Sequence, residues 1–122
     1  MKSHGHLGFK WSKDILYVEV FGPFNKEGVV EAASIYLDMI ANRKCTSFAV
    51  IEILDDESLG SPSALDEVSK LWKCLEQYNC TSLAIVSSNI VQHSIIESII
   101  PHIGKVFNRK EDAEQWIHSK GT

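Results

Sequence analysis

The sequence has no long apolar run, no cluster of basic residues and no excess of positive charge. Its 122 residues carry a formal net charge of -4, and no more than two Lys or Arg residues are consecutive. A membrane span needs about 20 apolar residues in a row, and binding to nucleic acid needs a basic surface that displaces counterions from phosphates. We therefore expect neither a membrane span nor a nucleic-acid partner.

Cysteine is scarce, and the amino terminus has no apolar segment. The three cysteines, Cys45, Cys74 and Cys80, are widely scattered and form no C-x-x-C motif, which favours a reduced interior over a disulfide framework. Residues 1–6 are polar and lack the apolar core of a signal peptide. The sequence thus predicts a mobile N-terminus over residues 1–6 and a cytoplasmic location.

Motifs for catalysis, metal binding and nucleotide binding are missing. The sequence contains no H-E-x-x-H, G-x-S-x-G, P-loop or G-x-G-x-x-G pattern. His93, His102 and His118 are separated by long intervals, and His4 and His6 lie in the N-terminal segment that we expect to be mobile. We expect no metal, no cofactor and no enzymatic activity.

Short apolar segments alternate with segments of helical periodicity along the chain. The apolar fraction is 44% and the charged fraction is 23%, as in an ordinary globular domain. Helices are predicted after the caps Asn25, Ser61 and Asn108 and over residues 92–102. The predicted strands are 7–13, 15–21, 47–54, 83–86 and 105–107.

This order, β-β-α-β-α-β-α-β-α, predicts a single α/β domain over residues 7–120. Strands separated by helices form right-handed crossovers and lie parallel in one sheet. The first two strands are close enough in sequence to form an antiparallel hairpin. We therefore expect a five-stranded, mostly parallel sheet with an antiparallel N-terminal strand.

The end of the chain carries a pattern in which a strand ending in Phe leads into a helix of the form E-x-A-x-x-W-hydrophobic. The matching positions are Glu111, Ala113, Trp116 and Ile117. With the element order, this pattern resembles the STAS-like proteins, the short stand-alone bacterial relatives of anti-sigma-factor antagonists, over residues 7–117. The resemblance implies a β-α superhelix, a framework shared with the CRAL-TRIO lipid-transfer domains.

The resemblance also implies a regulatory, protein-binding function and a place for it. In anti-sigma-factor antagonists, a Ser at the helix start after the central strand is phosphorylated by the partner kinase, and Ser61 is at that position. Gly60 replaces the Asp that precedes this Ser in the family, Pro62 follows it, and Ser63 is near the expected Gly. Ser58 and Ser63 are further candidates. Alternatively, Ser61 is simply an N-cap.

The third helix is apolar over more than one stripe. Its candidate surface residues are Ile95, Ile96, Ile99 and Ile100. Excess apolar surface predicts a partner site, a homodimer face or the wall of a ligand pocket, unless the helix is covered by its neighbours. The alternative function is thus a small-ligand or lipid-binding domain of CRAL-TRIO type with an apolar pocket beside this helix.

Two glutamates, Glu19 and Glu52, each interrupt an apolar strand. If the register placed both on one face, paired carboxylates could perform acid/base chemistry. The usual alternation of strands instead favours two polar positions that point outward.

Overall fold

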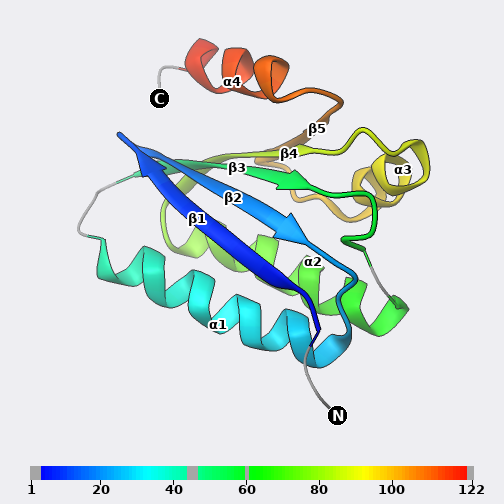
Figure 1. Cartoon of the computed structure of the whole chain (residues 1–122). Coiled ribbons are helices and arrows are strands. Elements are labelled where there is room, and N and C mark those ends of the chain that lie inside the picture. Colours follow the sequence, from blue (N-terminus) through cyan, green and yellow to red (C-terminus); the bar gives the residue numbers. More distant parts are fainter. Residues whose placement is uncertain (1–3, 44–46, 60, 121–122) are drawn as a thin grey trace.

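The structure is a computed structural model, and it describes residues 4–43, 47–59 and 61–120. An initial hairpin of two strands is followed by four helices that alternate with three further strands (Figure 1). The strands are β1 (His6–Ser12), β2 (Ile15–Phe21), β3 (Phe48–Leu54), β4 (Cys80–Val86) and β5 (Gly104–Phe107). The helices are α1 (Lys26–Asn42), α2 (Pro62–Gln77), α3 (Ile90–Ile99) and α4 (Lys110–Ser119).

The strands form one sheet in the order β1-β2-β3-β4-β5. β1 is antiparallel to β2, and the other neighbouring pairs are parallel. β3 lies at the centre, and six of its seven residues are buried, as expected for a strand covered on both faces. The predicted α/β class, the mixed sheet and the element order are confirmed.

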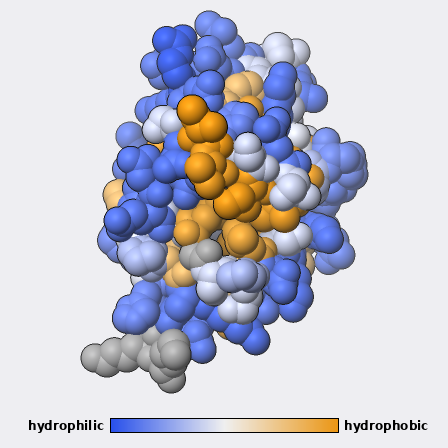
Figure 2. Space-filling view, turned by 90° about the vertical axis from the view of Figure 1, so that its right-hand side faces the viewer, coloured by the Kyte–Doolittle hydropathy of each residue, from blue (hydrophilic) through white to orange (hydrophobic). Residues whose placement is uncertain are grey.

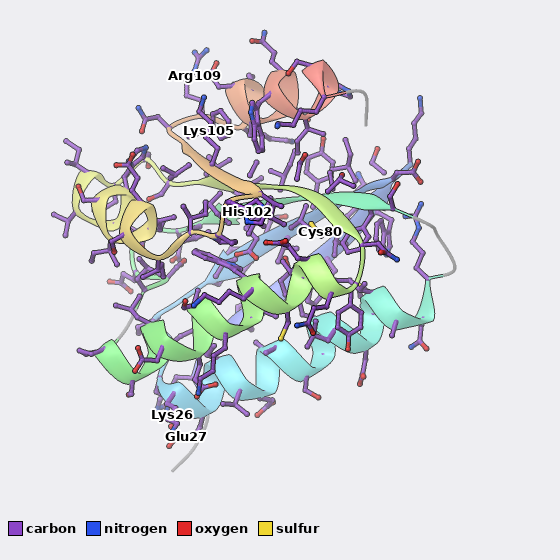
Figure 3. All side chains as sticks on the ribbon, turned by 180° about the vertical axis from the view of Figure 1, so that it is seen from behind. Lys26, Glu27, Cys80, His102, Lys105 and Arg109 are labelled. Carbon is purple, nitrogen blue, oxygen red and sulfur yellow. The ribbon has the colours of Figure 1, made fainter. Side chains whose placement is uncertain are left out.

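Helices cover the two faces of the sheet unequally. α1, α2 and α3 pack against one face and share a large apolar core that includes Tyr36, Trp72 and Ile96. α4 packs on the other face, where Ala113 and Ile117 meet a smaller cluster. Figure 3 shows this arrangement from behind, with α1 and α2 on the side of the sheet opposite α4. No helix in the described part of the chain is both long and apolar enough to cross a membrane.

Two of the three predicted helix caps are confirmed. The Asn25 side chain accepts a hydrogen bond from the Gly28 N–H, and Ser61 Oγ accepts one from the Ala64 N–H. The prediction for Asn108 is wrong, because α4 begins after Arg109, which makes no side-chain cap.

The predicted bounds of α3 are also corrected. The helix begins after Asn89, whose side chain accepts a hydrogen bond from the Gln92 N–H, and not at residue 92. It ends at Ile99, and Ile100 is extended. Pro101 explains this end, because proline disfavours the helical conformation of the residue before it. The start moves two apolar residues, Ile90 and Val91, into the first turn.

Candidate functional site

The loop between β3 and α2 lies where the parallel strands end, the edge at which open α/β sheets place their sites. Asp55 organises this loop. Its carboxylate accepts hydrogen bonds from the N–H of Gly22 (3.2 Å), from the N–H of Glu57 (3.1 Å) and from Ser58 Oγ (2.7 Å). The hydrogen bonds of this acid therefore tie Glu57 and Ser58 of the loop to Asp55, and Asp55 to Gly22.

Gln92, on α3, connects this loop to the third helix. Its side chain is only 5% exposed. Nε2 donates to the carbonyl of Asp55 (2.9 Å) and to Ser87 Oγ (3.0 Å), and Oε1 accepts from the N–H of Leu59 (3.1 Å). The start of α3 and the β3–α2 loop thus form one connected surface. Gln92 was not among the residues predicted from the sequence, although its place three residues after the helix cap Asn89 was a usable signal for the first turn of α3.

The three candidate serines lie in different environments. Ser61 caps α2 and is exposed, and its hydroxyl lies 3.0 Å from that of Ser63, which is also exposed. Ser58 is only 3% exposed, and its Oγ contacts the carbonyl of Val20 (3.0 Å) as well as Asp55. The proposal of Ser58 as a modification site is therefore corrected: its hydroxyl belongs to the internal support of the loop.

The isoleucines predicted to form a surface on α3 mostly face the core. Ile96 is fully buried, so its inclusion in that surface was wrong. Ile95 is half-buried, and Ile99 and Ile100 are half-buried against the large core. Helical periodicity could not indicate which apolar stripe the sheet covers.

The exposed apolar surface of α3 is instead at its first turn. Ile90 is 84% exposed and Val91 is 70% exposed, more than any other large apolar side chain of the described residues. Figure 2 shows hydrophobic surface gathered on the face that carries α3 and the beginning of α2. We call Ile90, Val91 and the half-buried Leu59 the apolar patch. The exposed Asp56 and Glu57 lie in the adjoining loop.

Glu19 and Glu52 lie on opposite faces of the sheet. In the register between β2 and β3, Val18 is beside Glu52 and Glu19 is beside Ile53. Because side chains alternate along a strand, this offset of one residue separates the two carboxyls. Glu19 is exposed, as the alternation predicted. The same prediction was wrong for Glu52, which is only 5% exposed and points into the core.

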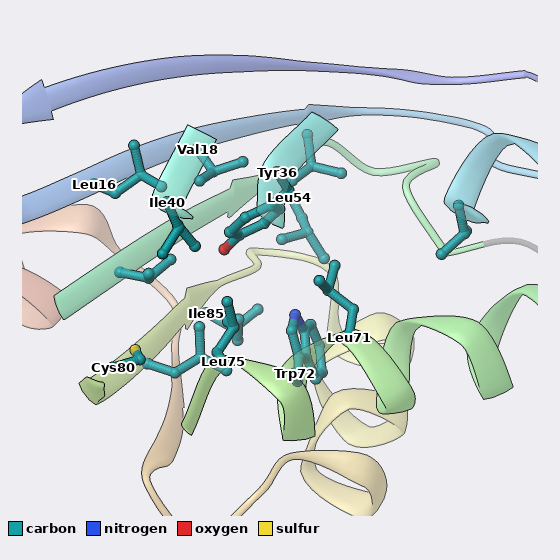
Figure 4. Packing of buried hydrophobic residues seen from close by; sticks show 14 of the residues in the cluster. Leu16, Val18, Tyr36, Ile40, Leu54, Leu71, Trp72, Leu75, Cys80 and Ile85 are labelled. Atoms are coloured by element: carbon teal, nitrogen blue, oxygen red, sulfur yellow. The ribbon is translucent and has the colours of Figure 1, made fainter. Parts of the chain in front are cut away.

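Glu52 is held between α1 and α2 by two hydrogen bonds to the same oxygen. Tyr36 OH donates to Glu52 Oε2 at 2.7 Å, and Trp72 Nε1 donates to it at 3.0 Å. Figure 4 shows Tyr36 and Trp72 facing the same space between the helices. Burial raises the pKa of Glu52 from 4.5 to about 7, and the two donors only partly oppose this effect.

The cysteines and histidines form no reactive cluster. Burial raises the pKa of the Cys80 thiol to about 12, so it is a poor nucleophile. Cys74 is half-buried, and Cys45 lies outside the described residues. Within residues 4–43, 47–59 and 61–120, no group of three or more His, Cys, Asp or Glu is placed to hold a metal ion.

Comparison of the chain with known proteins relates it to solved structures. No family model matches it, and no curated protein does. The NMR structure of the protein TM1081 is 16% identical, with a TM-score of 0.69 over 90% of this chain and 86% of that one.

A second solved structure supplies the class of fold. An uncharacterized protein of the DUF3478 family from Shewanella loihica PV-4, described as having a SpoIIAA-like fold, is 19% identical. Its TM-score is 0.63 over 95% of each chain. The chain therefore has the SpoIIAA-like fold, and the STAS-like fold predicted from the sequence is confirmed.

Proposed function

We propose that this chain is a non-catalytic, regulatory protein-interaction module of STAS type that binds its partner through the apolar patch and the adjoining acidic loop. The observation that carries the proposal is the exposure of Ile90 (84%) and Val91 (70%) beside Asp55 and Leu59, which Gln92 holds by hydrogen bonds. An exposed apolar surface on a rigid support is typical of binding sites. A preorganised surface also loses little conformational entropy on binding.

The charges around the patch define the kind of partner. The exposed Asp56 and Glu57 lie in the loop, and the exposed Asp66 lies in the first turns of α2. Like charges across an interface are repelled, and opposite charges steer association. The complementary surface therefore has an apolar centre and a basic rim.

A charged residue in the patch tests the proposal. We expect Val91→Glu to abolish cross-linking from a photoreactive residue placed at position 90 of the full-length chain in its native cells. Val30→Glu is the matched control, since Val30 is 49% exposed on α1. Cross-links that survive Val91→Glu, or that disappear equally with Val30→Glu, would refute this surface. A product of twice the mass of the chain would identify the partner as a second copy.

The partner-switch form of this function would act through Ser61. Its hydroxyl is exposed, and it is at a helix N-terminus, where the free N–H groups and the helix dipole favour a phosphate. Asp66 and Glu67 on the same helix oppose it. Ser61→Asp imitates the charge and retains a capping oxygen. A change in cross-linking with Ser61→Asp but not with Ser61→Ala would support the switch, and identical behaviour of both variants would oppose it.

Binding of a small ligand is the second candidate function. An apolar cleft favours it, although its position differs from the one predicted beside α3. The cleft lies between α1, α2 and the sheet, and no residue of α3 lines it.

A further inference from the structure

The cleft between α1, α2 and the sheet has an acid at its inner end. It has a volume of about 40 Å³, and apolar side chains from both helices and three strands form most of its wall. Glu52 is the only charged residue among the residues that line it. A carboxyl in such a place fixes the orientation of a bound molecule, as a few polar groups do in most apolar pockets.

One oxygen of Glu52 is left over for a ligand. Oε2 accepts both protein hydrogen bonds, from Tyr36 and Trp72. Oε1 accepts none from the residues that the structure describes. Among the same residues, every side-chain oxygen or nitrogen that solvent cannot reach has a hydrogen-bond partner. Oε1 is therefore reachable from the cleft that Glu52 lines.

A second cavity lies next to the first. It has a volume of about 130 Å³ and lies between β1 and α1. The two cavities share Leu7 and Ala32 in their walls. A molecule with its head at Glu52 would direct its tail toward these two side chains and the outer cavity.

The inner cavity has one charged residue in its wall, and that residue is an acid. The outer cavity is lined by His6 and Glu31, and neither lining, among the described residues, includes a lysine or an arginine. An anionic head group in the inner cavity would face the Glu52 carboxyl with no lysine or arginine beside it. A cationic head group would stabilise the ionised form of Glu52, which burial otherwise disfavours. Binding therefore has to offset both the ligand's own desolvation and the cost of ionising this carboxyl.

We propose that this cleft is a binding site for a short aliphatic amine, whose nitrogen pairs with Oε1 of Glu52 and whose chain lies along Leu7 and Ala32. The inference does not depend on the proposed function, because it rests on Glu52, Leu7 and Ala32, none of which belongs to the apolar patch. Leu59 is the single residue that lies both in the patch and in the wall of the cleft. The two cavities limit the ligand to a few carbons, since a cavity of about 150 Å³ holds a molecule of the size of benzene.

The test compares three probes of equal chain length, namely pentylamine, pentan-1-ol and pentanoate, on the full chain. Titration is followed by amide NMR and by the indole N–H signal of Trp72. We expect pentylamine to bind with a dissociation constant of about 1 mM or lower, and at least about tenfold more tightly than pentanoate. Binding of the alcohol as tight as that of the amine would overturn the proposal, as would no binding of the amine at about 10 mM.

Two matched variants place the site. Ala32→Met fills the wall shared by both cavities and should weaken pentylamine binding at least about tenfold. Ser34→Met adds the same side chain at an exposed position of α1 and should leave binding within about twofold. Equal affinity of both variants would overturn the location. If Ala32→Met fails to fold, the amide shifts that pentylamine causes in the unaltered chain locate the site instead. Shifts confined to residues away from Leu7, Leu71 and Trp72 would overturn the proposed location.

Discussion

Replacing Glu52 with glutamine should change how the stability of the protein depends on pH. Glutamine has nearly the same shape, and its Oε1 can still accept hydrogen bonds from Tyr36 and Trp72. The substitution removes only the proton equilibrium of the buried carboxyl. Any pH-dependent difference between the variant and the wild type therefore reports on Glu52.

The magnitude follows from the pKa. Burial raises the pKa of Glu52 from an ordinary value of 4.5 to about 7 in the folded state. Between these values the folded protein binds a proton that the unfolded chain has released, so the stabilising contribution is complete below pH 4.5 and is lost as the pH rises through 7. One pKa unit corresponds to about 1.4 kcal/mol, so the loss is about 3 kcal/mol.

Urea unfolding at a series of pH values measures this difference. We expect the free energy of unfolding of Glu52→Gln, relative to wild type, to rise by about 3 kcal/mol between pH 4.5 and pH 8. The other carboxyls contribute equally to both proteins, so they cancel. Glu19→Gln is the matched control: Glu19 is exposed on the opposite face of the sheet, and its difference should stay within about 0.5 kcal/mol.

A relative stability that does not change with pH would refute the reasoning, because it would mean that Glu52 titrates alike in the folded and unfolded states. A relative stability of Glu52→Gln that falls as the pH rises would refute it more strongly. That result would require the folded protein to favour the charged carboxylate, and the two donors to outweigh burial.

Changes at three other residues, Gln92, Ser61 and Cys80, test the structure further. Gln92→Ala should lower the free energy of unfolding by about 2 kcal/mol, because the Leu59 N–H loses its partner; unchanged amide exchange at Leu59 would contradict this. Ser61→Ala should lower the free energy of unfolding by about 1 kcal/mol, because the helix cap is lost. Ser61→Asp should retain the cap. Equal changes in melting temperature for the two variants would contradict the capping role of Ser61. Cys80 is buried, and the pKa of its thiol is raised to about 12. It should therefore react with a disulfide reagent more slowly than the half-buried Cys74. Equal reaction rates of the two thiols, measured by peptide mass analysis, would contradict the burial of Cys80.

Local chemistry explains which elements could be predicted. Asn25 and Ser61 act as caps because their short polar side chains meet the free N–H groups of the helix that they precede. The same rule could have located Asn89, and Pro101 could have located the end of α3. The rule failed at Asn108, where the helix begins one residue later.

The candidate site was predicted less completely, because its parts come from distant segments. The resemblance to STAS-like proteins pointed to the β3–α2 loop, and Ser61 was predicted correctly to lie at a helix start. Gln92, which fixes that loop, comes from α3, more than thirty residues later than Asp55. No local pattern relates the two.

The sequence by itself determined the element order, the mixed sheet and the caps Asn25 and Ser61, since periodicity and capping depend on neighbouring residues. Only the tertiary structure decided which side chains are covered. A register offset of one residue buries Glu52 and exposes Glu19. The packing of α3 against the sheet buries Ile96 and leaves Ile90 in solvent. Both outcomes depend on contacts between elements that are far apart in the chain, and such contacts are invisible to local pattern.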